Sequence, residues 1–179
     1  VDALHVLDPT MLLDANDYIE LFKQKQTHRS KGNLLNYVLD ETNEIENLIK
    51  KVSSEKKMIT FAVNNPYEGD NTKPLNRRIK PSVETWLRGF YDADFVITDS
   101  FHACAFSIIF KKQFIVVGNK ERGMARFKSL LKMFGLEERL VDENVDVNTL
   151  QPIDYDKVYN LYGKLKEKSI HFLSENLFS

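Results

Sequence analysis

Cysteine is nearly absent from the chain: Cys104 is its one thiol among 179 residues, so no disulfide can form within it. A lone free cysteine is compatible with a reducing compartment. No apolar run approaches the ~20 residues that a membrane-spanning helix needs, so no membrane span is expected. Lys and Arg number 25 against 26 Asp and Glu, which leaves a net charge close to zero. Because nucleic-acid binders usually carry a basic excess, no nucleic-acid partner is predicted.

Motifs that hold phosphate or metal are also missing. The sequence contains neither a P-loop nor a G-x-G-x-x-G segment, which argues against the usual dinucleotide and P-loop sites. The four histidines show no spacing typical of metal ligands. We therefore predict neither a metal site nor a bound cofactor.

The length and composition are those of one globular domain. Hydrophobic residues make up 42% of the chain and charged residues 28%, and a chain of this size can bury a substantial core. The sequence opens at Val1 rather than at Met, and directly in an apolar stretch. We therefore expect a piece of a longer protein, with one domain over residues 1–179 that closes on a helix at 154–178.

Short apolar runs alternate with helical patterns along most of the chain, whereas the first thirty residues show little beyond a turn at 8–10. The expected strands are 34–39, 58–63, 94–98, 114–117 and 139–141, and the expected helices are 41–53, 81–91, 101–110, 124–134 and 155–177. The strands are apolar throughout rather than alternating, which favours a mainly parallel sheet covered on both faces. With right-handed crossovers this is an α/β fold, a Rossmann-like three-layer domain.

Three loops should carry the chemistry, because ligands bind outside the carboxyl ends of the strands in an open parallel sheet. They are residues 64–67, residues 98–102, and residues 118–123 with Arg126 one helical turn further on. We expect these loops to line one edge of the sheet together.

The loop at 98–102 is the most informative of the three. Asp99 or Ser100 is suited to cap the helix that follows, and the start of a helix favours an anion. His102 lies in the first turn of this otherwise apolar helix, where an imidazole can act as a general acid or base. The alternative is that His102 only hydrogen-bonds a neighbouring carbonyl. Cys104 is interpreted as a small core residue rather than a nucleophile.

The next loop supplies positive charge. Lys120, Arg122 and Arg126 are the kind of groups that an anionic donor needs, since arginine can bind phosphate or carboxylate through two parallel hydrogen bonds. The alternative is a solvated basic loop that pairs with Glu121 or Glu137. The residues alone favour neither interpretation.

Several segments, in matching order, resemble the C-terminal half of polysaccharide pyruvyl transferases. The similarity runs over about residues 6–141, and the segments together are moderately specific although each is weak alone. The segments are VLDPT with LL (6–13), PSVETWL (81–87), DFVITDSFH (94–102), FIVV (114–117), and RGMARF with SLL and FGLE (122–137).

The resemblance implies one half of a glycosyltransferase-B-type fold, in which two Rossmann-like domains face a cleft. The expected partners are then an N-terminal domain of the same protein, phosphoenolpyruvate and a saccharide acceptor. Members of the family transfer pyruvate from phosphoenolpyruvate to sugar hydroxyls as a ketal in polysaccharide biosynthesis. This chain alone is expected to be inactive. The expected location is cytoplasmic, extending to the membrane periphery where polysaccharide is assembled.

The resemblance also assigns site residues. The family's histidine, usually in a Ser/Thr-x-x-His-Gly setting, matches His102, which becomes the expected catalytic residue. The expected donor- and phosphate-binding residues are Ser100, Ala103, Asn119, Lys120, Arg122 and Arg126. The chain departs from the family at Ala103, where the usual glycine would let a donor approach the backbone closely.

Two other functions stay open at this point. One is a nucleotide-sugar glycosyltransferase of the same architecture, which would need a pocket for a base and a ribose. The other is a non-catalytic domain that kept the fold, which the alanine at position 103 slightly favours. Similarity of fold does not choose among these functions, because such folds host many chemistries.

Overall fold

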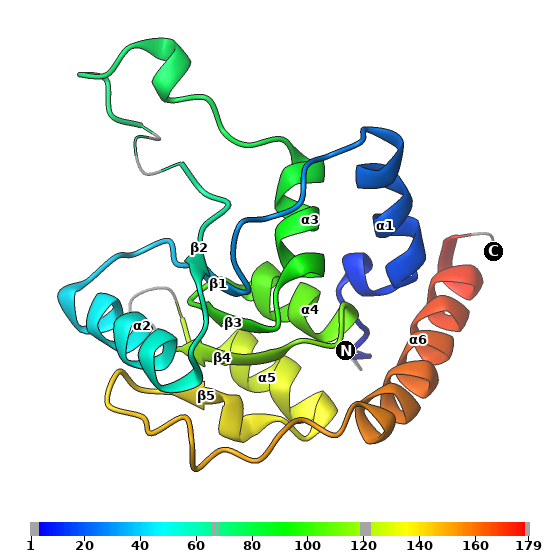
Figure 1. Ribbon diagram of the computed structural model, residues 1–179. Coiled ribbons are helices and arrows are strands. Elements are labelled where there is room, and N and C mark those ends of the chain that lie inside the picture. Colours follow the sequence, from blue (N-terminus) through cyan, green and yellow to red (C-terminus); the bar gives the residue numbers. More distant parts are fainter. Residues whose placement is uncertain (1–3, 66, 68, 119–122, 178–179) are drawn as a thin grey trace.

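The computed structural model describes residues 4–65, 67, 69–118 and 123–177. Within these residues, five strands form one all-parallel sheet in the order β2-β1-β3-β4-β5, with helices on both faces (Figure 1). The strands are β1 (Leu34–Tyr37), β2 (Thr60–Phe61), β3 (Phe95–Thr98), β4 (Gln113–Val117) and β5 (Leu140–Val141). The helices are α1 (Ala15–Gln24), α2 (Asn43–Lys56), α3 (Val83–Asp92), α4 (Phe101–Ile109), α5 (Ala125–Phe134) and α6 (Tyr155–Leu177), with short 3-10 helices η1 (Pro9–Met11), η2 (Leu75–Arg77) and η3 (Glu137–Arg139). The predicted Rossmann-like three-layer α/β fold is confirmed.

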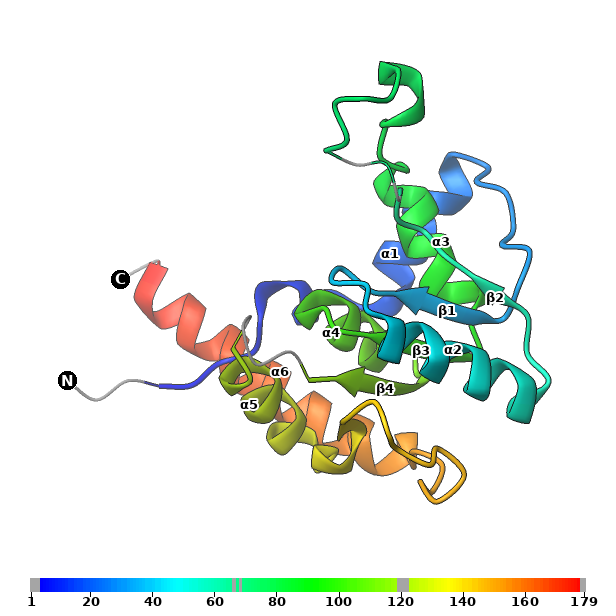
Figure 2. The ribbon, with the colours of Figure 1, turned by 90° about the vertical axis from the view of Figure 1, so that its left-hand side faces the viewer.

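Alternate residues of the central strands face different layers. Ile97 and Ile115 pack against Leu48 of α2 on one face of the sheet. Val96 and Phe114 belong to a second buried cluster, which the other helices build on the opposite face. In Figure 2, β1 accordingly lies between α3 and α2. Burial on both faces explains why the strands read as apolar throughout.

Helix α4 is held on several sides. Its residues from Ala103 to Ile109 are all buried, and hydroxyl groups of α6 bond to its last turn. The Tyr155 hydroxyl donates to the carbonyl of Ser107 at 3.1 Å, and the Tyr159 hydroxyl donates to the carbonyl of Ile109 at 2.5 Å. The last turn of α4 is therefore tied to α6, while the body of the helix is buried against the rest of the core.

The N-terminal part of the chain contains a helix that the sequence analysis missed. Helix α1 begins after Asp14, whose N–H donates to the Asp17 carboxylate at 2.8 Å. It buries Tyr18 and Phe22 in the core cluster that also contains α3 residues. Two aspartates three residues apart resemble a capping box in which an acid replaces the usual Ser or Thr, and that was the available signal.

The second predicted strand was too long. Only Thr60 and Phe61 pair with β1, although the apolar run covers 58–63. After Phe61 the chain leaves the sheet edge, and Val63 packs against α3 at Gly89. An added Cβ on Gly89 would lie 2.5 Å from a Val63 methyl carbon, so the missing side chain makes this contact possible.

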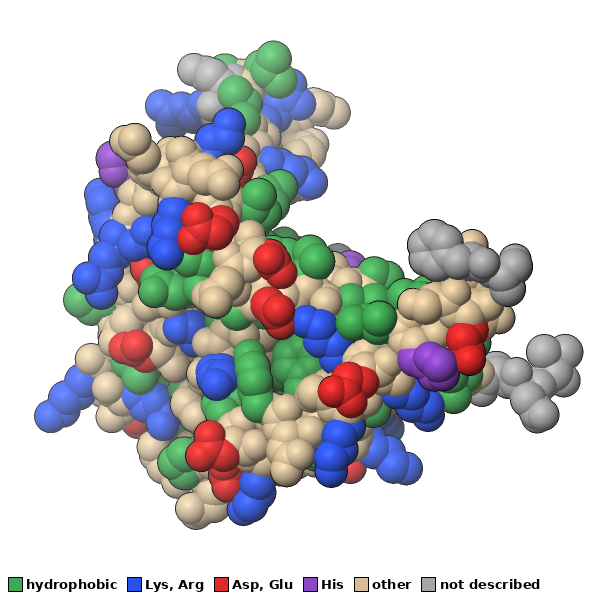
Figure 3. Space-filling view, turned by 90° about the vertical axis from the view of Figure 1, so that its right-hand side faces the viewer, with side chains coloured by type: hydrophobic (Ala, Val, Ile, Leu, Met, Phe, Trp, Pro, Cys, Tyr) green, Lys and Arg blue, Asp and Glu red, His purple; other side chains and the backbone are tan. Residues whose placement is uncertain are grey.

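Residues 69–80 project away from the rest of the molecule and carry several Lys and Arg side chains (Figures 1 and 3). The base of this projection is closed by Asn65, whose amide donates to the carbonyls of Arg77 and Ile79 at 3.0 and 2.8 Å. The short helix η2 lies inside this projection. Across the part of the chain that the structure describes, no helix combines the length and apolar character needed to cross a membrane.

Candidate functional site at the carboxyl edge of the sheet

Asp99 joins the loops that follow β1 and β3. Its carboxylate, in a residue only 2% exposed, accepts the N–H groups of Leu39 and Asp40 at 2.8 and 2.9 Å. The Thr98 hydroxyl adds a third link by donating to the carbonyl of Tyr37 at 2.6 Å. These bonds tie residues 39 and 40 to the loop after β3, and β1 ends at Tyr37 rather than at the predicted residue 39.

The two linked strands mark the place where the strand order reverses. From β1 the chain moves to β2 on one side of the sheet, and the later strands β3, β4 and β5 lie on the other side. Open α/β sheets bind ligands at such a reversal, outside the carboxyl ends of the strands. The Asp99 turn lies at this point.

The side chain that was predicted to cap α4 does not do so. Ser100 takes the N-cap position, but its side chain makes no cap bond, and its N–H donates to the Thr98 hydroxyl at 3.0 Å. The Asp99 carboxylate instead accepts hydrogen bonds from the loop after β1. The first intrahelical donor is Cys104, whose N–H reaches the Ser100 carbonyl at 3.0 Å. The N–H groups of residues 101–103 therefore receive no side-chain cap from either residue, and an uncapped helix start favours an anion.

His102 and Arg126 come together through one aromatic ring. His102 is exposed in the first turn of α4, with its ring centroid 5.6 Å from that of Phe101. The Arg126 guanidinium of α5 stacks on the same Phe101 ring at 5.4 Å from the centroid. Within the described residues, no hydrogen bond ties the His102 ring to a carbonyl. Two predicted site residues from different helices thus stand at one helix start, and both are accessible.

The other residues predicted to bind the donor include one buried residue and three that the structure does not describe. Ala103 is completely buried, backbone and methyl group alike, and belongs to the core cluster at the start of α4. Asn119, Lys120 and Arg122 lie outside the described residues. Cys104 is completely buried, and burial raises the pKa of its thiol far above the ordinary value. It is a core residue, as predicted.

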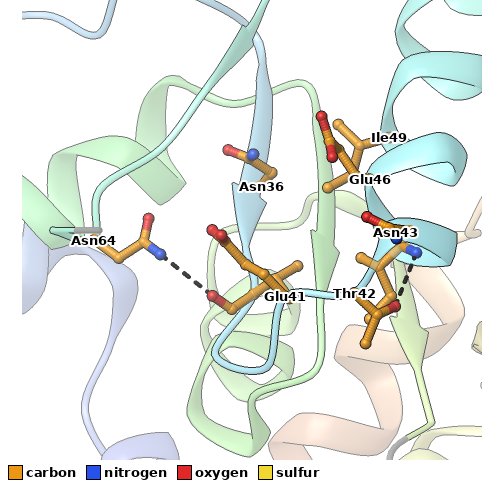
Figure 4. A pocket seen from close by; sticks show the side chains of 9 residues that line it. Asn36, Glu41, Thr42, Asn43, Glu46, Ile49 and Asn64 are labelled. Atoms are coloured by element: carbon orange, nitrogen blue, oxygen red, sulfur yellow. Dashed lines mark hydrogen bonds between the residues drawn. The ribbon is translucent and has the colours of Figure 1, made fainter. Parts of the chain in front are cut away.

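The loop after β1 was missed as part of this edge. Together with the start of α2 it lines a pocket of about 430 Å³, which Asn64 closes from the loop after β2 (Figure 4). A second pocket, of about 840 Å³, shares Thr42 and Ile45 with the first and extends to Asp99 and Gly118. The rule that selected the other three loops also applies to the carboxyl end of β1, so the polar residues 40–43 were the available signal.

Among the described residues, no group of three or more His, Cys, Asp or Glu side chains is placed to hold a metal ion. The described residues of the edge instead contribute backbone N–H groups without a side-chain cap, the exposed imidazole of His102, the guanidinium of Arg126 and the polar pocket beside them. This arrangement suits organic ligands with anionic and hydroxyl groups.

The fold and this edge define an α/β protein of the Rossmann-like class with an anion-favouring helix start at the reversal of strand order. The family model described as polysaccharide pyruvyl transferase matches residues 1–121 of the 179. The chain therefore belongs to the polysaccharide pyruvyl transferase family, as the resemblance implied. The matched region includes the Asp99 turn and His102. A search of curated proteins found no match to the chain, and a search of solved structures found none either.

Proposed function

We propose that the protein transfers a pyruvyl group from phosphoenolpyruvate to two hydroxyl groups of a saccharide, forming a ketal. In this proposal the chain is the donor-side domain, which resembles one half of a glycosyltransferase-B-type fold and works with an N-terminal domain of the same protein. Family membership supports a transferase of this class. The observation that carries the donor assignment is the uncapped start of α4, with His102 and Arg126 beside it.

The donor's two anionic groups match the two kinds of partner at this edge. Phosphoenolpyruvate has a phosphate and a carboxylate. The N–H groups of the first turn of α4 suit one anion, and the Arg126 guanidinium suits the other because it can donate two parallel hydrogen bonds. Phe101 holds that guanidinium over its ring, so the charge is already in place before a ligand arrives.

The proposed reaction is a balanced addition and displacement. A proton adds to the methylene carbon of phosphoenolpyruvate, which becomes a methyl group and leaves the neighbouring carbon electron-poor. One sugar hydroxyl attacks that carbon and loses its proton, phosphate leaves, and a second hydroxyl closes the ketal with loss of its own proton. His102 is the proposed acid/base or phosphate contact. As an acid/base it would contribute on the order of 10²–10⁴ in rate.

Thermal melts test the donor site. The wild-type chain, His102→Ala, Arg126→Gln and the control Lys132→Gln are compared with phosphoenolpyruvate, inorganic phosphate and a UDP-sugar. Lys132 is exposed at the far end of α5, so its substitution removes a cation without touching the site. A ligand at ~100 times its Kd adds about 2.7 kcal/mol, which raises the Tm of a chain of this size by about 5–10 °C.

We expect a shift with phosphoenolpyruvate that Arg126→Gln and His102→Ala reduce and Lys132→Gln retains. A shift with the UDP-sugar alone would point to a glycosyltransferase instead. The absence of any shift would argue against a donor site on this chain. In the complete enzyme, unchanged turnover of His102→Ala would exclude the acid/base role.

A further inference from the structure

The pocket between β1, β2 and α2 has a polar lining that the donor site does not use. Figure 4 shows Asn64 on one side, α2 on the other, and Asn36 and Glu41 between them. The pocket measures about 430 Å³, which falls in the ≈ 300–1,000 Å³ range of small-molecule sites. Six of its nine lining residues are polar: Asn36, Glu41, Thr42, Asn43, Glu46 and Asn64.

The lining is rich in hydrogen-bond acceptors and lacks positive charge. The nine described residues that line the pocket include no Lys and no Arg, whereas two are glutamates. An anion such as phosphoenolpyruvate would meet repulsion there. Lys50 lies 2.6 Å from the Glu46 carboxylate and offsets part of the negative charge, so the pocket does not demand a cation either. Amide and carboxylate oxygens of this kind suit a neutral ligand that carries several hydroxyl donors.

One acceptor in the lining lacks a partner. The Asn36 side-chain oxygen is enclosed and has no hydrogen-bond partner among the described residues. Leaving such a group unpaired is costly, and buried polar atoms in folded proteins usually have a partner. Asn64 is already engaged, since its amide donates to the carbonyl of Val38 at 3.2 Å and so fixes one wall. A ligand hydroxyl that reached the Asn36 amide would satisfy it after a small rotation of the amide group.

The pocket adjoins a larger one that reaches the Asp99 turn. Thr42 and Ile45 line both this pocket and the larger one, and the larger one reaches Asp99 and Gly118, where the loops that lead to His102 and Arg126 begin. A chain of sugar units lying along this edge could therefore place one unit in the polar pocket and present its neighbour to the α4 N-terminus.

We infer that the pocket lined by Asn36, Glu41, Asn43, Glu46 and Asn64 is a subsite for a neutral sugar unit of the acceptor. This assignment rests on the proposed function, which supplies a saccharide as the second substrate. The pocket then selects the acceptor through hydroxyl donors rather than through charge, and the anionic donor stays at the α4 N-terminus.

Titrations followed by amide chemical shifts test the subsite, with methyl glucoside, methyl galactoside and methyl mannoside as probes. Two matched pairs lie on α2: Asn43→Ala against Asn47→Ala, and Glu46→Gln against Glu44→Gln. Asn47 and Glu44 are exposed and do not line the pocket. Loss of one hydrogen bond should weaken the Kd about 3- to 10-fold in Asn43→Ala and Glu46→Gln. Both controls should keep the wild-type Kd, with shifts confined to residues 36–49 and 64, which include the whole lining of the pocket.

The outcomes distinguish a sugar subsite from a pocket that binds no sugar and from one that binds a cation. Saturable shifts at these residues, weakened only by the pocket variants, would support it. No saturable shift up to the solubility of the sugars, shifts elsewhere, or equal weakening in the controls would overturn it. So would a response to Mg²⁺ or Ca²⁺ in place of the sugars. If the proposed function is wrong, phosphoenolpyruvate should shift no amide signal in any variant. If only the subsite is wrong, phosphoenolpyruvate should still shift amide signals at the start of α4.

Discussion

The substitution Asp99→Asn should lower the free energy of unfolding by about 2 kcal/mol, because it removes one of the two hydrogen bonds that the Asp99 carboxylate accepts from the backbone. In Asp99→Asn the shape is kept and one oxygen still accepts an N–H. The new amide group, however, faces the second N–H with its own donors. One hydrogen bond to a charged acceptor is thereby lost, and such a bond contributes about 1.5–3 kcal/mol.

The lower half of that range is expected because water can partly replace the lost partner. Both bonds are only part-buried, and Leu39 is 42% exposed. For a chain of this length, a loss of about 2 kcal/mol lowers the Tm by about 4–8 °C. Urea unfolding should show a lower midpoint with an unchanged m-value, since the surface exposed on unfolding stays the same.

Asp94→Asn is the matched control at the other end of the same strand. Asp94 is exposed, and it accepts one bond from the Asn33 side chain at 2.9 Å. An asparagine there keeps an acceptor oxygen, so the change should stay within about 0.5 kcal/mol. If Asp99→Asn unfolds at the wild-type midpoint, or if both variants lose the same stability, Asp99 does not anchor the loop after β1.

Two further predictions follow from burial. Because Cys104 is completely buried and burial raises the pKa of its thiol, labelling with a thiol reagent should be negligible in the folded protein and complete in urea; rapid labelling of the folded protein would contradict this. Burial also raises the pKa of Tyr159 to about 12, above the ordinary value of 10.0, so its contribution to stability is full below pH 10 and is lost as the pH rises through 12. Between pH 10 and pH 12 the free energy of unfolding of Tyr159→Phe should therefore fall less than that of the wild type, as measured by urea unfolding. Equal falls in the two proteins would show that Tyr159 does not cause the pH dependence.

Much of the fold could be predicted from local patterns. Helix α3 begins after Ser82, whose side chain accepts the N–H of Thr85, and helix α5 ends at Gly135, which takes the left-handed conformation with φ of 66°. Both signals lie within a few residues of the helix end that they define. The boundaries of α6 were also predicted, because its pattern is long and continuous. Helix α1 was missed although its cap, Asp14 with Asp17, was a local signal. The short length of β2 was not predicted, because it depends on where the chain leaves the sheet to pack Val63 against Gly89.

The sequence by itself therefore determined the alternation of strands and helices along the chain from residue 34 onward, the layered class of fold and the turn that carries His102, because hydrophobic period and turn chemistry act over a few residues. Only the tertiary structure decided what this turn contacts. The 60-residue separation between Asp99 and Leu39 is bridged because β1 and β3 are neighbours in the sheet. Arg126 reaches the α4 N-terminus by stacking on Phe101. Such contacts depend on strand order and side-chain packing across elements, and no local pattern in the chain encodes them.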